Sequence, residues 1–190
     1  MRADVYLVKH GYYDSRARAQ AAIKAGLVSI NGQLLKKSAD KISDGARVLA
    51  GHEHPWVSRG GLKLEHALKE FKVNPLGQVC LDVGASTGGF TEVLVKNGAL
   101  KVYAVDVGHG QLHSSLKSNP AIISMESRDA RQLTSSDFSA PPTLIVCDAS
   151  FISATKVLKA PLSLAAPKAE LITLVTVSYT HLTLPTILLV

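Results

Sequence analysis

Residues 81–90 read Leu-Asp-Val-Gly-Ala-Ser-Thr-Gly-Gly-Phe, and they lie between an apolar run and an amphipathic stretch. This order predicts a β-strand, a glycine-rich turn and the start of a helix in direct succession. Gly84 can adopt backbone angles that a β-carbon forbids, and Gly88 and Gly89 let the backbone approach a ligand closely. The next apolar run ends at Asp106, where a carboxylate can accept hydrogen bonds from two ribose hydroxyls. The stretch therefore predicts an S-adenosylmethionine pocket.

Three other interpretations of this turn stay open. A dinucleotide-binding turn, G-x-G-x-x-G, needs a glycine where this chain has Ser86, which disfavours a nicotinamide or flavin cofactor. Residues 84–88 do match G-x-S-x-G, the nucleophile elbow of hydrolases, and Asp148 and His181 follow in the order of a Ser-Asp-His triad. An elbow serine normally follows several strands, however, whereas this turn follows the first strand of its domain. The turn could also join a strand to a helix without binding a ligand.

The composition predicts a globular cytoplasmic protein. At 190 residues and 46% hydrophobic content, the chain can form one small and one medium domain with a real core. Cys80 and Cys147 both lie in apolar runs, which favours buried, reduced thiols over a disulfide or a zinc site. No signal peptide is visible, and no apolar run is long enough to span a bilayer. We therefore expect neither a metal nor a membrane partner.

The positive charge is confined to the first part of the chain. Residues 1–77 carry 13 Lys and Arg against 7 Asp and Glu, whereas residues 78–190 carry 8 of each, so the net charge of +6 lies in the first segment. A basic segment followed by a neutral one predicts a nucleic-acid-binding module attached to a second domain.

The basic segment has the pattern of a small α+β domain over residues 1–50. Periodic apolar positions predict two short helices at 2–10 and 15–25. Asn-Gly at residues 31–32 lies between two apolar runs and predicts a β-hairpin. Residues 51–58 have the composition of a linker.

The rest of the chain predicts a doubly wound α/β domain. A helix is expected from 59 to about 71, followed by strands at 79–83, 101–106, 121–125, 144–148 and 170–175 with helical segments between most of them. Such alternation is typical of a parallel sheet covered on both faces. Ligands bind at the carboxyl ends of strands in these sheets, where Gly84, Asp106 and Asp148 would all emerge.

Three segments of the first domain, residues 2–7, 15–20 and 25–32, resemble the S-four-type RNA-binding domain in order and spacing. In that family the second helix and the hairpin form a basic surface for folded RNA. The resemblance implies phosphate contacts from Arg2, Arg16, Arg18, Lys24, Lys36 and Lys37, with Arg59 as a further RNA-binding residue beyond the linker. The alternative is an ordinary solvated helical face.

Four further segments, residues 58–64, 82–90, 106–108 and 147–153, resemble the hemolysin A-like (TlyA) family of ribosomal RNA methyltransferases, whose catalytic domain is related to FtsJ-type ribose methyltransferases. The resemblance implies S-adenosylmethionine-dependent 2′-O-methylation of ribosomal RNA, in a Rossmann-like domain over residues 59–175. The cofactor would be bound by Asp82, Gly84, Ala85, Ser86, Gly88, Gly89, Phe90, Asp106 and, after the third strand, Asp129.

The related ribose methyltransferases surround the reacting hydroxyl with a Lys-Asp-Lys-Glu set. The resemblance places the first lysine at Lys63 and the aspartate at Asp148, where alternative roles are a solvated helix lysine and a helix N-cap. After Val175 the sequence departs from the family pattern, and no lysine follows Lys168. We therefore expect residues 176–190 to be a foreign tail on a truncated methyltransferase domain, and this chain to be impaired.

Two other classes of function are weighed against the enzyme. The absent second lysine favours an RNA-binding protein without catalysis. A membrane-lytic protein is suggested by the historical name of the family alone, since no convincing amphipathic membrane helix supports it.

Overall fold

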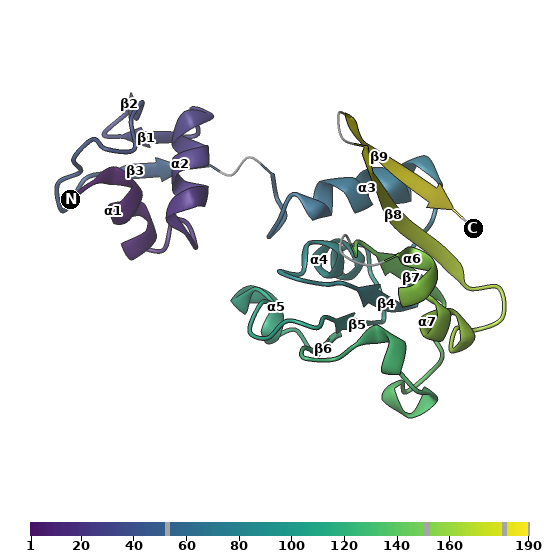
Figure 1. Ribbon diagram of the computed structural model, residues 1–190. Helices are drawn as coiled ribbons and strands as arrows, with labels where there is room; N and C mark the ends of the chain where they lie inside the picture. Colours follow the sequence, from purple (N-terminus) through teal and green to yellow (C-terminus); the bar gives the residue numbers. More distant parts are fainter. Residues whose placement is uncertain (52–53, 150–152, 180–181, 190) are drawn as a thin grey trace. The chain divides into compact units, whose positions relative to one another are not determined.

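The computed structural model describes residues 1–51, 54–149, 153–179 and 182–189, and it divides the chain into two compact units (Figure 1). The N-terminal unit is Met1–Pro55 and the C-terminal unit is Trp56–Val190. The sequence places residues 56–58 in a linker, but the structure places them in the C-terminal unit. The reason is that the Trp56 side chain is buried in the core of that unit, against Leu64 and other apolar residues.

The N-terminal unit has the predicted helices and hairpin. Its elements are α1 (Ala3–Lys9), α2 (Arg16–Lys24), β1 (Val28–Ile30), β2 (Gln33–Leu34) and β3 (Val48–Ala50). The strands form an antiparallel sheet in the order β2-β1-β3. Both hairpin residues have positive φ, 51° at Asn31 and 82° at Gly32, as a tight turn of this kind requires. Leu7, Ile23 and Val28 form part of the small core between helices and sheet.

The C-terminal unit alternates strands and helices, as predicted. Its elements are α3 (Gly60–Glu70), β4 (Val79–Val83), α4 (Gly89–Lys96), β5 (Lys101–Val105), α5 (Ser114–Lys117), β6 (Ile122–Met125), η1 (Ala130–Gln132), η2 (Ser135–Asp137), β7 (Leu144–Cys147), α6 (Ala154–Val157), α7 (Lys159–Ser163), β8 (Glu170–Tyr179) and β9 (Leu182–Leu189). β8 runs beyond the predicted end at 175, and β9 was not predicted, because residues 176–190 were expected to form a tail.

The described strands of this unit form one sheet in the order β6-β5-β4-β7-β8-β9. The adjacent pairs among β6, β5, β4, β7 and β8 are all parallel, and β9 pairs with β8 antiparallel. The chain starts at β4, moves outward through β5 and β6, and returns to the other side of β4 with β7. The direction of winding therefore changes between β4 and β7, and the crevice at such a point is where ligands bind in this class of fold.

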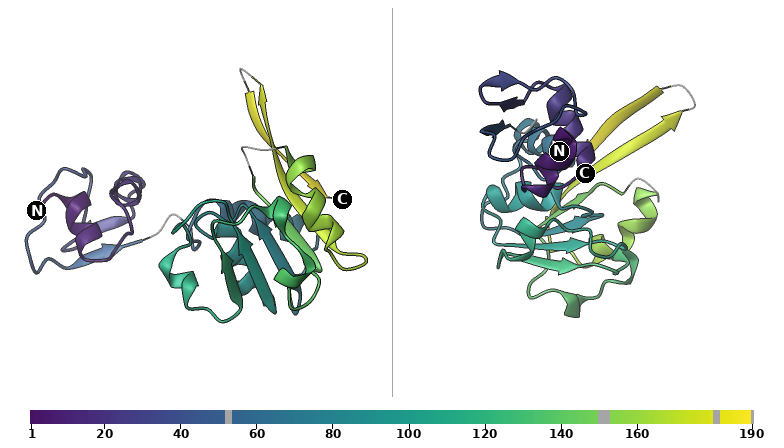
Figure 2. Two further views of the ribbon diagram at one scale, coloured as in Figure 1. Left: turned by 60° about the horizontal axis from the view of Figure 1, so that its bottom comes forward. Right: turned by 90° about the vertical axis from the view of Figure 1, so that its left-hand side faces the viewer.

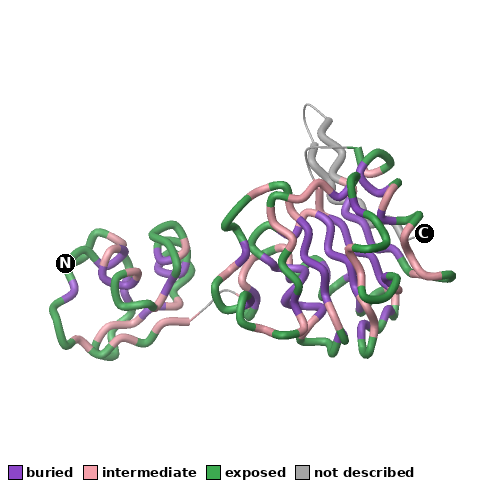
Figure 3. The backbone as a smooth tube through the Cα atoms, turned by 90° about the horizontal axis from the view of Figure 1, so that it is seen from below, coloured by how far each residue is buried: buried purple, intermediate pink, exposed green. Residues whose placement is uncertain are grey.

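Helices lie on both sides of the sheet (Figure 2). Alternation along the strands directs Cys80, Val102 and Leu144 into a core with residues of α3 and α4. Leu81 and Ile145 enter another core, with residues of α6 and η1. The strands run through the middle of the unit as its most buried segments (Figure 3).

The two cysteines are buried and unbridged, which confirms that part of the prediction. Burial, together with the nearby carboxyl of Asp82, raises the pKa of Cys80 to about 12. No helix within the described ranges has the length and apolar character needed to cross a membrane.

Candidate functional site

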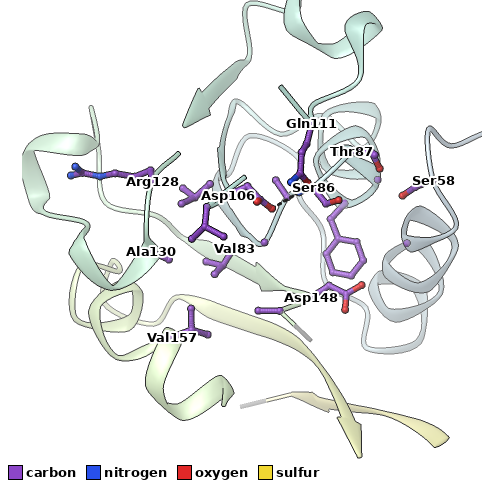
Figure 4. A pocket seen from close by; sticks show the side chains of 18 of the residues that line it. Ser58, Val83, Ser86, Thr87, Asp106, Gln111, Arg128, Ala130, Asp148 and Val157 are labelled. Atoms are coloured by element: carbon purple, nitrogen blue, oxygen red, sulfur yellow. Dashed lines mark hydrogen bonds between the residues drawn. The ribbon is translucent and has the colours of Figure 1, made fainter. Parts of the chain in front are cut away.

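A cavity of about 840 Å³ lies at the carboxyl ends of β4, β5 and β7 (Figure 4). This volume falls within the usual range of small-molecule sites, roughly 300–1,000 Å³. Five segments contribute most of its walls: the start of α3, the turn after β4, the loop after β5, the loop after β6, and the end of β7. Their lining residues include Ser58, Arg59, Gly60, Lys63, Gly84, Ala85, Ser86, Thr87, Gly89, Phe90, Asp106, Gln111, Arg128, Asp129, Arg131 and Asp148.

Asp106 fixes the shape of the glycine turn. Its Oδ1 accepts a hydrogen bond from the backbone N–H of Gly108 at 2.7 Å. Its Oδ2 accepts one from the backbone N–H of Ser86 at 2.8 Å (Figure 4). Ser86 has a φ of 47°, an uncommon conformation that this bond helps to hold. Each carboxylate oxygen has two lone pairs, so Asp106 keeps acceptor capacity for a ligand hydroxyl on both oxygens.

Gly84 lies where the chain leaving β4 passes close to the end of β7. Its φ is 82°, and an added β-carbon would lie 3.3 Å from the backbone oxygen of Asp148. Both requirements favour glycine, since other residues rarely adopt this φ and the space is restricted. The turn can therefore bring a ligand close to the ends of both strands.

Two predicted cofactor residues, Gly88 and Asp82, do not line the cavity. Gly88 has a φ of 92° at the N-cap of α4, and an added β-carbon would meet the side chains of Leu112 and Leu116. Glycine at this position therefore allows Leu112 and Leu116 to pack directly against the backbone of the turn.

Asp82 points away from the cavity, into the layer beneath α4. It is 1% exposed, its Oδ2 accepts a bond from the Thr91 hydroxyl at 2.6 Å, and its Oδ1 has no partner among the described residues. Burial is the main cause that raises the pKa of Asp82 to about 7. The hydrogen bonds from Thr91 lower this pKa, whereas the negative charges of Asp148 and Asp106 raise it further. Alternation along β4 directs Val83 and Asp82 to opposite faces of the sheet, which is why Val83 lines the cavity and Asp82 does not. Direct contact of Asp82 with the cofactor stays a prediction.

Asp129 lines the cavity but is already paired. Its carboxylate accepts bonds from the Arg131 guanidinium, the shortest at 2.6 Å, and from the Arg131 backbone N–H at 2.9 Å. These bonds hold the pKa of Asp129 below its usual value. Arg131, Arg128 and Gln111 also line the cavity and were not predicted, because they lie in loops or, for Arg131, in the short helix η1, without a recognisable spacing.

Lys63 and Asp148 meet at the cavity, although 85 positions separate them in the sequence. The Nζ of Lys63 in α3 lies 3.8 Å from Oδ2 of Asp148 at the end of β7. Both side chains are partly exposed, at 48% and 26%. Asp148 does not cap the next helix, because Ser153 occupies the N-cap of α6.

The hydrolase alternative stays without a described triad, because its histidine, His181, lies outside the described residues. The same applies to residues 150–152 of the last family motif. No histidine lines the cavity within the described part of the chain. No group of three or more metal-ligating side chains is found where the chain is described.

Six of the predicted RNA-binding residues lie in the N-terminal unit, and Arg59 lines the cavity of the C-terminal unit. Arg2 and Arg16 both bond to Asp4, and Arg18 pairs with Asp14 at 2.8 Å. Lys24 ends α2. Lys36 and Lys37 are exposed after β2.

Comparison with known families agrees with this division of the chain. Residues 56–182 match the FtsJ-like methyltransferase family, and residues 1–48 match the S4 domain. The chain belongs to the FtsJ-like methyltransferase family. This finding confirms the methyltransferase fold predicted from the glycine turn and the strand pattern, and the order of the two domains.

Curated relatives confirm the resemblance to hemolysin A and TlyA. The chain is 44% identical over 176 residues to the 16S/23S rRNA (cytidine-2′-O)-methyltransferase TlyA of Mycobacterium tuberculosis, covering 92% of this chain and 66% of that protein. It is 44% identical over 158 residues to "Hemolysin A" of Brachyspira hyodysenteriae, covering 83% of this chain and 66% of the relative. The chain therefore spans about two thirds of the length of these relatives.

A solved structure from Streptococcus thermophilus, provisionally named a hemolysin, superposes with a TM-score of 0.67 at 39% identity. The match covers 93% of this chain and 66% of that one.

Proposed function

We propose that this chain carries the RNA-binding and catalytic parts of an S-adenosylmethionine-dependent ribosomal RNA ribose 2′-O-methyltransferase. The proposal is supported by family membership, by the names of the TlyA relatives and by the geometry of the cavity. The residues present fit the cofactor. The cavity has the volume of a small-molecule site, Asp106 can accept hydrogen bonds from ribose hydroxyls, and the backbone of Gly84 and Gly89 lines the cavity.

One observation carries the catalytic part of the proposal. Lys63 and Asp148 form a 3.8 Å ion pair in the wall of the same cavity that contains Asp106. When bound, the cofactor supplies an electrophilic methyl group on a sulfonium. The protein must then align a ribose 2′-hydroxyl behind that methyl group, so that much of the catalysis is positioning.

In the proposed mechanism Lys63 and Asp148 act on the hydroxyl of the RNA. The Asp148 carboxylate accepts a hydrogen bond from the hydroxyl, orients its oxygen, and takes its proton as the oxygen forms a bond to the methyl carbon and the methyl–sulfur bond breaks. The Lys63 ammonium lies beside it and stabilises the negative charge that develops on the oxygen as the proton is lost. The family set has a second lysine and a glutamate, for which the sequence after Val175 provides no counterpart.

Radiolabelled methyl transfer to purified ribosomal subunits tests this proposal. We expect weak transfer by the present 190 residues, because the second cation is absent. A version continued after Val175 with the sequence of the Mycobacterium tuberculosis relative should transfer methyl groups faster and lose most of that rate on Lys63→Ala. Lys69→Ala, which removes an exposed lysine from the same helix, is the matched control. Full activity of the Lys63→Ala version would reject the assigned catalytic pair.

A further inference from the structure

Asp4 is a fully buried carboxylate on the first turn of α1, with a side-chain exposure of 0%. Its Oδ1 accepts a bond from Arg2 Nε at 3.1 Å, and its Oδ2 accepts one from Arg16 Nη2 at 2.9 Å. Gln20 donates to Oδ2 at 2.7 Å. A buried charge is tolerated only when it is paired in this way. These donors, Arg2 first and Gln20 next, hold the pKa of Asp4 well below its usual value.

The two arginines that Asp4 holds are themselves exposed. The side chain of Arg2 is 49% exposed and that of Arg16 is 58% exposed. Each guanidinium directs its Nε and one terminal nitrogen toward Asp4. A guanidinium has five N–H donors, so each retains three for another partner. The cluster of Asp4, Arg2 and Arg16 therefore has a net charge of +1 and presents two arginine donor sets beside each other.

We propose that Asp4 is a positioning residue that holds Arg2 and Arg16 as a two-armed clamp for one backbone phosphate of RNA. The inference rests on the proposed RNA-binding function of the N-terminal unit. Without Asp4 the two guanidinium groups would repel each other and their long side chains would sample many rotamers. Held by one carboxylate, they are pre-organised, so less conformational entropy is lost when a phosphate binds. Arginine is well suited to such bidentate contacts with phosphate oxygens.

This proposal and simple charge attraction predict opposite results for one substitution. Asp4→Asn removes a negative charge and raises the net charge from +6 to +7. If RNA affinity depended on charge alone, binding would become tighter. If Asp4 positions the arginines, binding should weaken about tenfold, the effect of losing roughly one charged hydrogen bond. Asp44→Asn is the matched control, because Asp44 is exposed in the same unit and its loss changes the charge equally.

Thermal melting first shows that each variant folds. The affinity of the full chain and of each variant for a labelled RNA hairpin is then measured by fluorescence anisotropy at several salt concentrations. Asp4→Asn should bind more weakly than both wild type and Asp44→Asn. The effect of Asp4→Asn should be smaller in an Arg16→Gln background, because one of the two arginines that Asp4 positions is then absent. Binding by Asp4→Asn as tight as that of Asp44→Asn would overturn the clamp while leaving RNA binding intact. Absence of RNA binding by the wild type would reject the RNA-binding function and the clamp together.

A second measurement uses only the wild-type chain, and it tests the proposal even if the Asp4→Asn variant does not fold. Nitrogen-15 relaxation of the arginine Nε–H groups in the RNA-free wild type should show Arg2 and Arg16 more rigid than Arg47, an exposed arginine of the same unit. Equal mobility of the three would overturn the proposal.

Discussion

Asp106 has two roles in the proposed site: it holds the glycine turn in place, and it accepts hydrogen bonds from the ribose of the cofactor. Because its carboxylate holds the N–H groups of Ser86 and Gly108, Asp106→Ala should both loosen the turn and remove the acceptor of the ribose hydroxyls. A hydrogen bond to a charged group contributes about 1.5–3 kcal/mol, so its loss should weaken the affinity for S-adenosylmethionine roughly tenfold to hundredfold. Calorimetric titration measures this affinity, and Asp44→Ala, in the N-terminal unit, is the control. Equal heats from wild type and Asp106→Ala, or tight binding of NAD, would contradict the pocket assignment.

Asp82 gives the C-terminal unit a pH-dependent stability. Its pKa rises from 3.8 to about 7 on folding, so the folded chain binds more protons than the unfolded chain between these values. Stability therefore decreases as the pH rises through this window, by up to about 4 kcal/mol, and this contribution is constant above it. We expect Asp82→Asn to become progressively more stable than wild type from pH 4 to 7. Urea unfolding of both proteins across this range measures the difference, and a difference independent of pH would show that Asp82 does not titrate there.

Single residues also mark how far the sequence could predict the site. Gly84 and Asp106 lie at strand ends, so the pattern located them at the cavity. Asp82 does not line the cavity, because strand alternation directs its side chain to the opposite face from Val83, and the order of residues in the motif does not show this. The partnership of Lys63 with Asp148 came from family resemblance, since no local spacing brings α3 to β7.

At the scale of elements, the strands were predictable because buried parallel strands are continuous apolar runs bounded by turn residues. β4, β5, β6 and β7 were located within one residue at each end. β9 was not, because residues 176–190 were interpreted as foreign to the family and no pairing partner was considered for them. An antiparallel partner of β8 is a tertiary choice that the local sequence does not determine.

The start of α3 depends on close packing against Trp56. A β-carbon at Gly61 would lie 2.5 Å from Trp56 Cγ, whereas one at Gly60 would come no closer than 3.3 Å, to the Ser58 hydroxyl. Gly61→Ala should therefore lower the free energy of unfolding by about 1–3 kcal/mol through overpacking. Gly60→Ala, in the same helical turn, should stay within about 1 kcal/mol of wild type, since alanine favours the helix. Urea unfolding compares the two, and equal effects would show that Trp56 can move aside.

At the scale of the whole molecule, the charge division predicts where RNA affinity originates. Combined replacement of Arg16, Arg18 and Lys24 by glutamine should flatten the slope of log affinity against log salt by up to about 3, roughly 0.9 for each phosphate that these side chains no longer neutralise. Replacing three exposed lysines of the C-terminal unit, Lys69, Lys117 and Lys159, removes the same charge and should change the slope less. Anisotropy titrations from low to moderate salt measure both. An unchanged slope in the first variant would locate the RNA surface elsewhere.

The order of strands in the C-terminal sheet also has a consequence for synthesis on the ribosome. The strand pairs and helix contacts of the N-terminal unit all lie within its first 51 residues, so it can fold once these have emerged. β4 is different, because its neighbour β7 is translated only after β5 and β6. Until then the crevice between Gly84 and Asp148 does not exist. We expect the nascent chain to acquire its basic RNA-binding surface well before its cofactor cavity, because domains fold from the N-terminus during translation.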